Sequence, residues 1–320
     1  MKRALAALMC ASAVLAGPAR ADYPDRGVRI VVPFPAGQTT DVLARTIGQQ
    51  LTEMLGQSFY VDNRGGAGGI IGMEHAKRSE PDGYTLLMAS SGPLAINMGL
   101  YKDLPYDTLR DFRAVSMLVV VPQFLVTRTD FPADTLEGLI KHVKSQPGKL
   151  NYGSGGSGLT NHLTMEMLKR EAGLNITHVP YRGAAAALTG LMGGDTAMMF
   201  ESGPAIMPHV QKGTLKVFAV GSRRGSQALP DVPTVDKAGV PGFDAQTWAA
   251  MLVPAGTPDE VVHKLNQALH TALEKPEVRK QLATLGAEVQ LSTPDQAQQY
   301  IRDEIGRWAE IIKVSGAKPD

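Results

Sequence analysis

Short runs of β-branched residues alternate with helical patterns along most of this chain, and this alternation constrains the fold more than any other feature. The run Val28-Arg29-Ile30-Val31-Val32 is typical of a buried strand, and apolar residues at four-residue steps from Leu43 to Leu55 predict a helix over 40–55. Further strands are expected at 59–61, 84–89, 149–152, 176–181, 197–200 and 216–220, with helices at 70–78, 159–171, 184–192 and 204–212. Strands joined by crossover helices run parallel, so the pattern predicts an α/β fold.

The C-terminal part of the chain has strong signals for the start of helices. Thr257-Pro258-Asp259-Glu260 predicts a helix with Thr257 as its N-cap, and Thr293-Pro294-Asp295 predicts another that runs to about Ser315. These helices need a sheet to cover, so we expect them to return to the first domain. The chain then crosses between domains near 121–123 and near 246–248, and two antiparallel crossings form a hinge.

The predicted organisation therefore has three parts. Residues 1–21 form a signal peptide, residues 22–122 plus 248–320 form a discontinuous domain 1, and residues 123–247 form domain 2. Each domain is expected to have a mostly parallel central sheet flanked by helices. A chain of about 300 residues is long enough for two such domains.

The N-terminal segment is typical of an export signal. Lys2 and Arg3 precede an apolar stretch over 4–15, which is shorter than the roughly 20 residues that span a bilayer. Ala19-Arg20-Ala21 fits the small-x-small cleavage pattern, so we expect export to the periplasm with cleavage after Ala21. The only cysteine, Cys10, lies in this segment, which leaves the mature chain without thiol chemistry or disulfides.

Charge gives no sign of a polyanionic partner. The chain has 32 basic and 31 acidic residues, and the basic residues do not cluster. A near-neutral surface of this kind argues against nucleic acid as a partner.

Two segments share a design that attracts anions. Phe34-Pro35-Ala36-Gly37-Gln38-Thr39-Thr40-Asp41 and Gly153-Ser154-Gly155-Gly156-Ser157-Gly158-Leu159-Thr160 each follow a strand and open a helix. The first N–H groups of a helix lack internal partners and carry partial positive charge, so they attract carboxylate or phosphate. Both loops fall at the carboxyl ends of strands, where ligands bind in open parallel sheets. Simple helix capping, with Thr40 or Asp41 as the cap, is the alternative.

Other motifs in the sequence would point to different functions. Gly153, Gly155 and Gly158 match the dinucleotide pattern G-x-G-x-x-G, but the next strand ends in Tyr181-Arg182-Gly183 without the acidic residue that this fold requires. Gly66-Ala67-Gly68-Gly69 is read as tight helix–strand packing. The chain has no G-x-S-x-G or H-E-x-x-H motif, and His162 is read as a core or surface residue. We therefore expect no catalytic residue, no metal site and no cofactor.

An ordered set of motifs resembles the Bug family, the extracytoplasmic solute receptors of tripartite tricarboxylate transporters. The set covers essentially the whole mature chain and consists of Phe34-Pro35-Ala36-Gly37 with Asp41, 63–69, 81–85, the Gly/Ser-rich loop at 153–158, 179–183, 229–234, Trp248 and 254–258. The resemblance implies a type II periplasmic binding protein fold that closes over its ligand like a Venus flytrap. It also implies that both loops hold one carboxylate of the ligand.

The resemblance assigns ligand contacts residue by residue. The first loop contributes Phe34, Ala36, Gly37, Gln38, Thr39, Thr40 and Asp41, and the second contributes Ser154, Gly155, Gly156, Ser157 and Thr160. Further contacts are expected from Ser90, Ser91, Tyr181, Arg182, Gly183, Glu201 and Trp248. Two of these depart from the family pattern, because Gln38 replaces a glycine and Glu201 stands where Asp is common, and both bear on which ligand is bound.

The expected function is that of a monomeric receptor for a small carboxylate: a dicarboxylate, a tricarboxylate, an acidic amino acid or an aromatic acid. Its partners would be the membrane subunits of a tripartite tricarboxylate transporter. A receptor that signals to a sensor protein and a periplasmic hydrolase of carboxylate esters are the alternatives. A hydrolase would use His162 as a base, but the sequence shows no activated nucleophile beside it.

Thr40→Pro tests whether the first loop binds ligand. Proline at this position should distort the loop and the helix start, because it restricts the preceding residue. We expect carboxylate affinity measured by calorimetry to fall while circular dichroism shows a folded protein. Unchanged affinity in the folded variant would mean that the loop is structural only.

Overall fold

The computed structural model describes residues 23–284 and 286–318. The predicted signal peptide and its cleavage site lie outside these residues. Among the described residues, no helix is long and apolar enough to cross a membrane.

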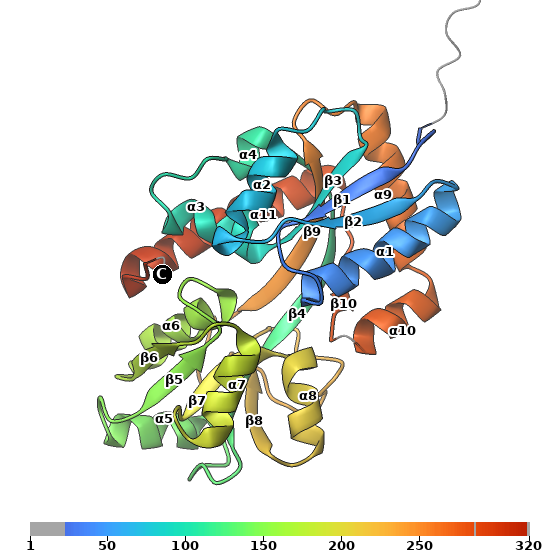
Figure 1. Cartoon of the computed structure of the whole chain (residues 1–320). Helices are drawn as coiled ribbons and strands as arrows, with labels where there is room; N and C mark the ends of the chain where they lie inside the picture. The colour runs from blue at the N-terminus through green and yellow to red at the C-terminus, as the bar shows by residue number, and fades with distance from the viewer. Residues whose placement is uncertain (1–22, 285, 319–320) are drawn as a thin grey trace, which may run out of the picture.

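The described chain forms two lobes joined by two long strands (Figure 1). The upper lobe contains β1 (Val28–Val32), α1 (Thr39–Leu55), β2 (Phe59–Asn63), the 3-10 turn η1 (Ala67–Gly69), α2 (Ile70–Lys77), β3 (Thr85–Ser90), the π-helical turn η2 (Gly92–Ile96), α3 (Asn97–Leu100), α4 (Thr108–Asp111), α9 (Asp259–Leu273), α10 (Pro276–Thr284) and β10 (Glu288–Val289). The lower lobe contains α5 (Leu136–Ser145), β5 (Asn151–Ser154), α6 (Thr160–Ala172), β6 (Thr177–Pro180), α7 (Ala184–Gly193), β7 (Met198–Ser202), α8 (Gly203–Gln211) and β8 (Leu215–Val220). The strands β4 (Phe112–Arg128) and β9 (Gln246–Pro254) connect the lobes, and α11 (Pro294–Ser315) ends the chain.

Each lobe has a core of three parallel strands. The order is β2-β1-β3 in the upper lobe and β6-β5-β7 in the lower lobe, and all four pairings within these groups are parallel. The antiparallel pairings all involve β4 or β9. The expected α/β class with two sheet-containing lobes is therefore confirmed. The two strands that connect the lobes run antiparallel to their neighbours.

The connecting strands β4 and β9 include the residues at which the sequence predicts the crossings. β4 and β9 run antiparallel, with Val121 opposite Thr247 and Pro122 opposite Gln246. β4 is one continuous strand of 17 residues that pairs with β9 in the upper sheet and with β7 and β8 in the lower sheet. The division of the chain into hinged domains at 122/123 and 247/248 stays a prediction.

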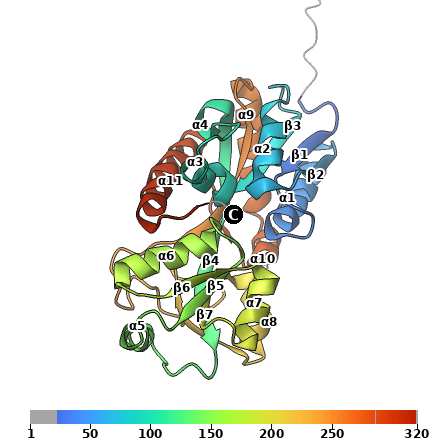
Figure 2. The same cartoon turned by 60° about the vertical axis from the view of Figure 1, so that its left-hand side comes forward.

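The last helix, α11, was expected to cover the first domain alone, but it contacts both lobes. α11 begins as predicted, with Thr293 and Gln296 forming a reciprocal capping box. It contacts β4, η2 and α3, but it also packs against α6 of the lower lobe. A helix of 22 residues is about 33 Å long, roughly the diameter of a small domain, so it can reach from one lobe to the other. Figure 2 shows α11 running along one side of the upper lobe towards the lower lobe.

One predicted cap is wrong. The N-cap of α9 is Pro258 rather than Thr257, and no side chain caps this helix. The Thr257 hydroxyl is buried and donates to the Pro254 carbonyl at 2.8 Å. The hydroxyl therefore closes the turn after β9, and it is not available to the first N–H groups of the helix.

Gly72 lets α2 pack closely against the backbone at Pro33, just before the first loop. A Cβ at Gly72 would lie 2.6 Å from the Pro33 Cα and 2.7 Å from the Arg64 carbonyl oxygen, both backbone atoms. A Cβ at Gly69 would lie 3.2 Å from the Pro93 side chain, a looser contact that agrees with the packing interpretation of the glycine-rich segment.

Gly72→Ala should lower the free energy of unfolding by about 1–3 kcal/mol, because the backbone must move to admit the methyl group. Gly306→Ala is the control: Gly306 lies exposed inside α11 with no atom near its Cβ position, so alanine there should stabilise by about 0.5–1 kcal/mol. Urea denaturation measures both, and equal effects of the two substitutions would contradict the packing argument.

Candidate ligand-binding site

A cavity of about 360 Å³ lies beside α11, but the larger cavity of about 870 Å³ lies between the lobes and is the candidate site. Its walls come from the upper lobe, the lower lobe and the connecting strands β4 and β9. The residues that share this lining with the predicted loops include Gly68, Asn97, Tyr101, Gln123, Asn161, Leu188, Met192, His209 and Thr247.

The first loop is held in place by a buried carboxylate. Asp41 accepts hydrogen bonds from the Gly37 N–H at 2.8 Å, the Asn63 amide at 2.9 Å and the Arg45 guanidinium. Burial would raise the pKa of Asp41, but the hydrogen bonds from Arg45, Gly37 and Asn63 hold it below its usual value. Gly37 has a φ of 85°, which lets its N–H turn back to Asp41.

This arrangement leaves the start of α1 uncapped. The N-cap residue is Gln38, and its side chain makes no capping hydrogen bond. Thr39 and Thr40, the first residues of the helix, line the cavity. Asp41 therefore acts behind the loop, and the simple capping alternative for Thr40 or Asp41 is wrong.

The second loop is held by a stack of aromatic rings. The Gly158 N–H donates to His162 Nδ1 at 2.9 Å, and the Ser154 hydroxyl lies 2.6 Å from His178 Nε2. The rings of His162 and His178 stack with centroids 3.9 Å apart, and His178 stacks in turn on Tyr152. His162 is thus a buried core residue, as the sequence predicted.

The start of α6 faces the same cavity as the start of α1. Its N-cap is Leu159, with no side-chain capping bond, and Thr160 and Asn161 line the cavity. The hydroxyls of Thr160 and Ser91 are 3.2 Å apart, a contact that links the second loop with the end of β3.

Two further helix starts reach the cavity. α7 has Gly183 as its N-cap and α8 has Ser202, and neither start has a side-chain cap. Gly183, Ala184 and Ser202 all line the cavity. Away from the cavity, α4, α5 and α11 are each capped by an Asp or Thr side chain, whereas α2 and α9 are not. The starts around the cavity offer N–H groups that favour an anion, although the His162 N–H of α6 already donates to Asn161 and the Ser202 N–H of α8 to Glu201.

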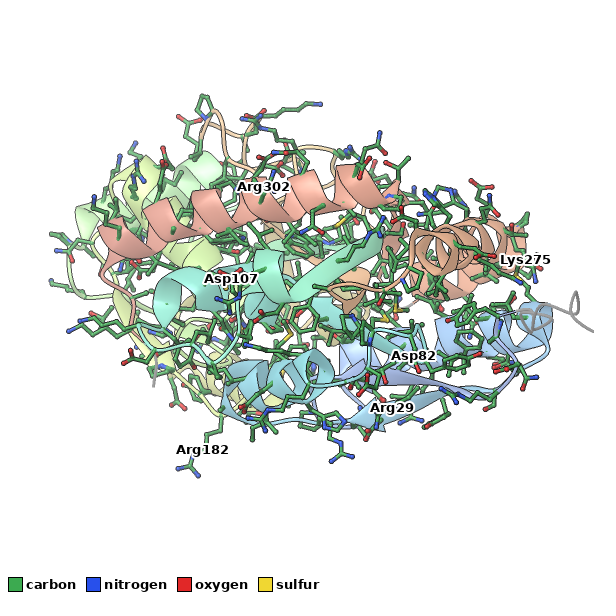
Figure 3. The ribbon with its side chains drawn as sticks, turned by 90° about the horizontal axis from the view of Figure 1, so that it is seen from above. Arg29, Asp82, Asp107, Arg182, Lys275 and Arg302 are labelled. Carbon is green, nitrogen blue, oxygen red and sulfur yellow. The ribbon has the colours of Figure 1, made fainter. Side chains whose placement is uncertain are left out.

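Glu201 is the acidic side chain of this lining. Burial raises the pKa of Glu201, although hydrogen bonds from the Ser202 N–H, the Ser202 hydroxyl and the Asn161 amide oppose the rise. Arg182 supplies a positive charge at the lining, and Figure 3 shows its side chain projecting away from the ribbon.

Most predicted contacts meet at this cavity. Those that line it are Phe34, Gly37, Gln38, Thr39, Thr40, Ser90, Gly155, Ser157, Thr160, Arg182, Gly183, Glu201 and Trp248. Ala36, Asp41, Ser91, Ser154, Gly156 and Tyr181 are outside the lining. Ser154 is buried behind the second loop, and Tyr181 packs its hydroxyl against Gly190 instead. Trp248 is fully buried, and its indole N–H donates to Glu304.

Sequence reasoning missed the polar residues of the connecting strands. The Gln123 amide donates to the Thr247 hydroxyl at 3.1 Å, and both side chains line the cavity. The sequence identifies these two residues only as positions where the chain crosses between the domains. Their side chains face the cavity because β4 and β9 pass across its floor, a placement that depends on strand register.

Two lobes joined by two strands, with a cavity between them, are the architecture of periplasmic solute-binding receptors. The family model described as the tripartite tricarboxylate transporter family receptor, TctC, matches residues 43–317. Protein BugT of Bordetella pertussis is 39% identical over 317 residues, which cover 98% of this chain and 97% of BugT. Among the solved structures, R. palustris Rpa4515 with adipate is 35% identical with a TM-score of 0.84, covering 93% of this chain and 100% of that one. MatC from Rhodopseudomonas palustris with bound malate is 33% identical with a TM-score of 0.78, covering 91% and 100%.

The chain therefore belongs to the TctC family of periplasmic solute-binding receptors, and the resemblance to Bug proteins is confirmed. Members of this family are receptors and not enzymes, which sets aside the hydrolase alternative. The dinucleotide pattern in the second loop accordingly belongs to a receptor loop. Among the described residues, no group of histidine, cysteine and carboxylate side chains could hold a metal ion.

Glu201→Gln should change the pH dependence of stability. A carboxyl group whose pKa is raised by folding binds its proton more tightly in the folded state. Its stabilising effect is therefore complete below the unfolded value of about 4.3 and is lost as the pH rises through the folded value. We expect the loss of stability on raising the pH above about 4.3 to be smaller in the variant. Urea denaturation at several pH values measures this, and identical slopes would show that Glu201 titrates normally.

Proposed function

We propose that this receptor captures a small carboxylate, with a dicarboxylate as the first candidate, and delivers it to the membrane subunits of a tripartite tricarboxylate transporter. The observation that carries the proposal is the convergence of four helix starts without side-chain caps on one cavity. Such starts supply N–H donors and partial positive charge, which match a carboxylate.

The first carboxylate would lie between α1 and α6. Thr39 and Thr40 approach from one lobe, and Thr160 and Asn161 approach from the other. A ligand group bound by both lobes is bound more tightly in the closed form than in the open form, so it would favour closure about β4 and β9. The contacts predicted at Gly37, Gly155 and Ser157 belong to the same subsite.

The distal part of the ligand would lie along a more apolar wall. Leu188, Met192 and Ala205 line this part of the lower lobe, with Thr189, His209 and the exposed Arg182 as polar groups. A linear chain ending in a second carboxylate suits such a surface, because the chain covers apolar residues and the end meets a guanidinium. The adipate and malate bound by the two R. palustris proteins are dicarboxylates and support this choice.

Export and partners follow from the same proposal. The mature receptor would begin after Ala21, in the periplasm, where it would meet the membrane subunits as a monomer. Intact mass of the protein secreted by a bacterial host would test the cleavage site.

A carboxylate panel tests the proposal. Malate, adipate, citrate, glutamate and benzoate are compared with a cationic amine by thermal unfolding and calorimetry. A ligand at 100 times its Kd should stabilise the protein by about 2.7 kcal/mol. Stabilisation by the amine, with none by any carboxylate, would contradict the proposal.

A matched pair of variants locates the ligand. Thr40→Val should weaken binding about tenfold or more, since a hydrogen bond to a charged group contributes about 1.5–3 kcal/mol. Thr46→Val is the control, because Thr46 lies on the same helix, donates to the Val42 carbonyl and is outside the cavity lining. Equal affinities of the two variants would place the carboxylate elsewhere.

A further inference from the structure

The smaller cavity, of about 360 Å³, lies against α11 where the two lobes meet. It is lined by Ser222, Arg223, Arg224, Gly242, Asp244 and Gln246 from the segment before and into β9, by Gln290, and by Tyr300, Glu304 and Arg307 of α11. In Figure 3, Arg302 of α11 and Arg182 lie on opposite sides of the molecule, so α11 lies far from the Arg182 side.

A hydrogen bond made by Trp248 links the lining of the smaller cavity to that of the larger one. Trp248 lines the larger cavity, and its indole N–H donates at 2.7 Å to Glu304, which lines the smaller one. Gln246 lies opposite Pro122, where β4 and β9 cross between the lobes. Arg307 donates to the Asp244 carbonyl and thereby ties α11 to the segment before β9. A change in this cavity would therefore act on the crossing strands.

The carboxylates of the smaller cavity are already occupied. Glu304 accepts from Trp248, from the Trp308 indole N–H at 3.1 Å and from Arg307. Asp244 accepts the Arg223 N–H at 3.1 Å. Of the three arginines, Arg223 lies 3.8 Å from Asp236, while no ion pair within the described residues involves the exposed Arg224. The cavity thus has positive charge that its own carboxylates do not fully neutralise.

Three buried polar atoms around this cavity lack a hydrogen-bond partner among the described residues: Arg307 Nε, Gln246 Oε1 and Gln290 Oε1. Gln246 is more than nine-tenths buried. A buried polar group without a partner costs free energy, so the cavity favours an occupant that satisfies these atoms. The unpaired set consists of one cationic donor and two amide carbonyls.

We propose that this cavity is a second binding site, for a small oxyanion that carries a hydroxyl group. Its anionic oxygens accept from Arg307 Nε and from Arg224, and its hydroxyl donates to the carbonyls of Gln246 or Gln290. Hydrogen phosphate and a short hydroxycarboxylate share this chemistry. The occupant joins α11 to the segment that leads into β9, so it shifts the equilibrium between open and closed forms of the larger cavity.

The two tryptophans of the chain allow a direct test. Both indole N–H groups donate to Glu304, but Trp308 is outside the lining of the larger cavity. We therefore expect the indole ¹H–¹⁵N signal of Trp308 to shift in a saturable way with inorganic phosphate or with malate, and not with chloride at equal ionic strength. The response to each probe tells the two sources of the oxyanion apart.

Variants assign the response to the cavity. Arg224→Gln should weaken the Trp308 response about tenfold, since it removes a charged donor. Gln290→Met, of similar size, should weaken it as well. Arg302→Gln is the control, because Arg302 is exposed on α11 outside the cavity lining and should leave the response unchanged.

Two outcomes would overturn the second site. The first is a Trp308 signal that neither probe moves at millimolar concentration, which would leave the cavity to water alone. The second is a response that Thr40→Val abolishes while Arg224→Gln leaves it intact, which would assign the effect to the larger cavity. Failure of every carboxylate to bind that larger cavity would not affect a phosphate response at Trp308.

Discussion

The backbone N–H groups at the starts of α1 and α6 are the feature on which the rest of this receptor depends. They come from different lobes, and neither N-cap side chain bonds them: Asp41 is turned back to Gly37, His162 is turned back to Gly158, and in α6 only the His162 N–H is accepted by a side chain, that of Asn161. Supporting residues therefore fix both loops from behind while the donors stay open towards the cavity. Under the proposed function, an anion placed there would complete the hydrogen bonding of both lobes at once, so binding and closure would be one event.

Under the proposed function, the connecting strands would form the hinge about which the lobes close. β4 and β9 pair antiparallel in the upper sheet, and β4 continues into the lower sheet beside β7 and β8. Gln123 and Thr247 lie on the two strands as part of the cavity lining. α11 packs on both lobes and carries Glu304, which accepts both indole N–H groups, so it would restrain such a closure. Ligand affinity in such a protein depends on the free energy of closure as well as on direct contacts.

Much of this arrangement can be predicted from the sequence, because it depends on local patterns. Helix starts after glycine-rich loops, the turn residues and the family motifs predicted both loops, and most of the contacts predicted from them line the cavity. Long-range register is different: Gln123 and Thr247 line the cavity only because two distant strands pair as they do. Roles that depend on hydrogen-bond direction also escape sequence reasoning. Asp41 and Ser154 belong to the predicted loops, but their side chains support the loops from the side away from the cavity. The Thr257 hydroxyl donates to a carbonyl of the preceding turn and does not cap the helix that follows.

A crystal structure with the tightest-binding dicarboxylate tests the central claim most directly. The account predicts that one carboxylate lies about 2.7–3.2 Å from backbone N–H groups at the starts of both α1 and α6, with the lobes closed around it. A ligand held through Arg182 alone, with those N–H groups facing solvent, would contradict the account.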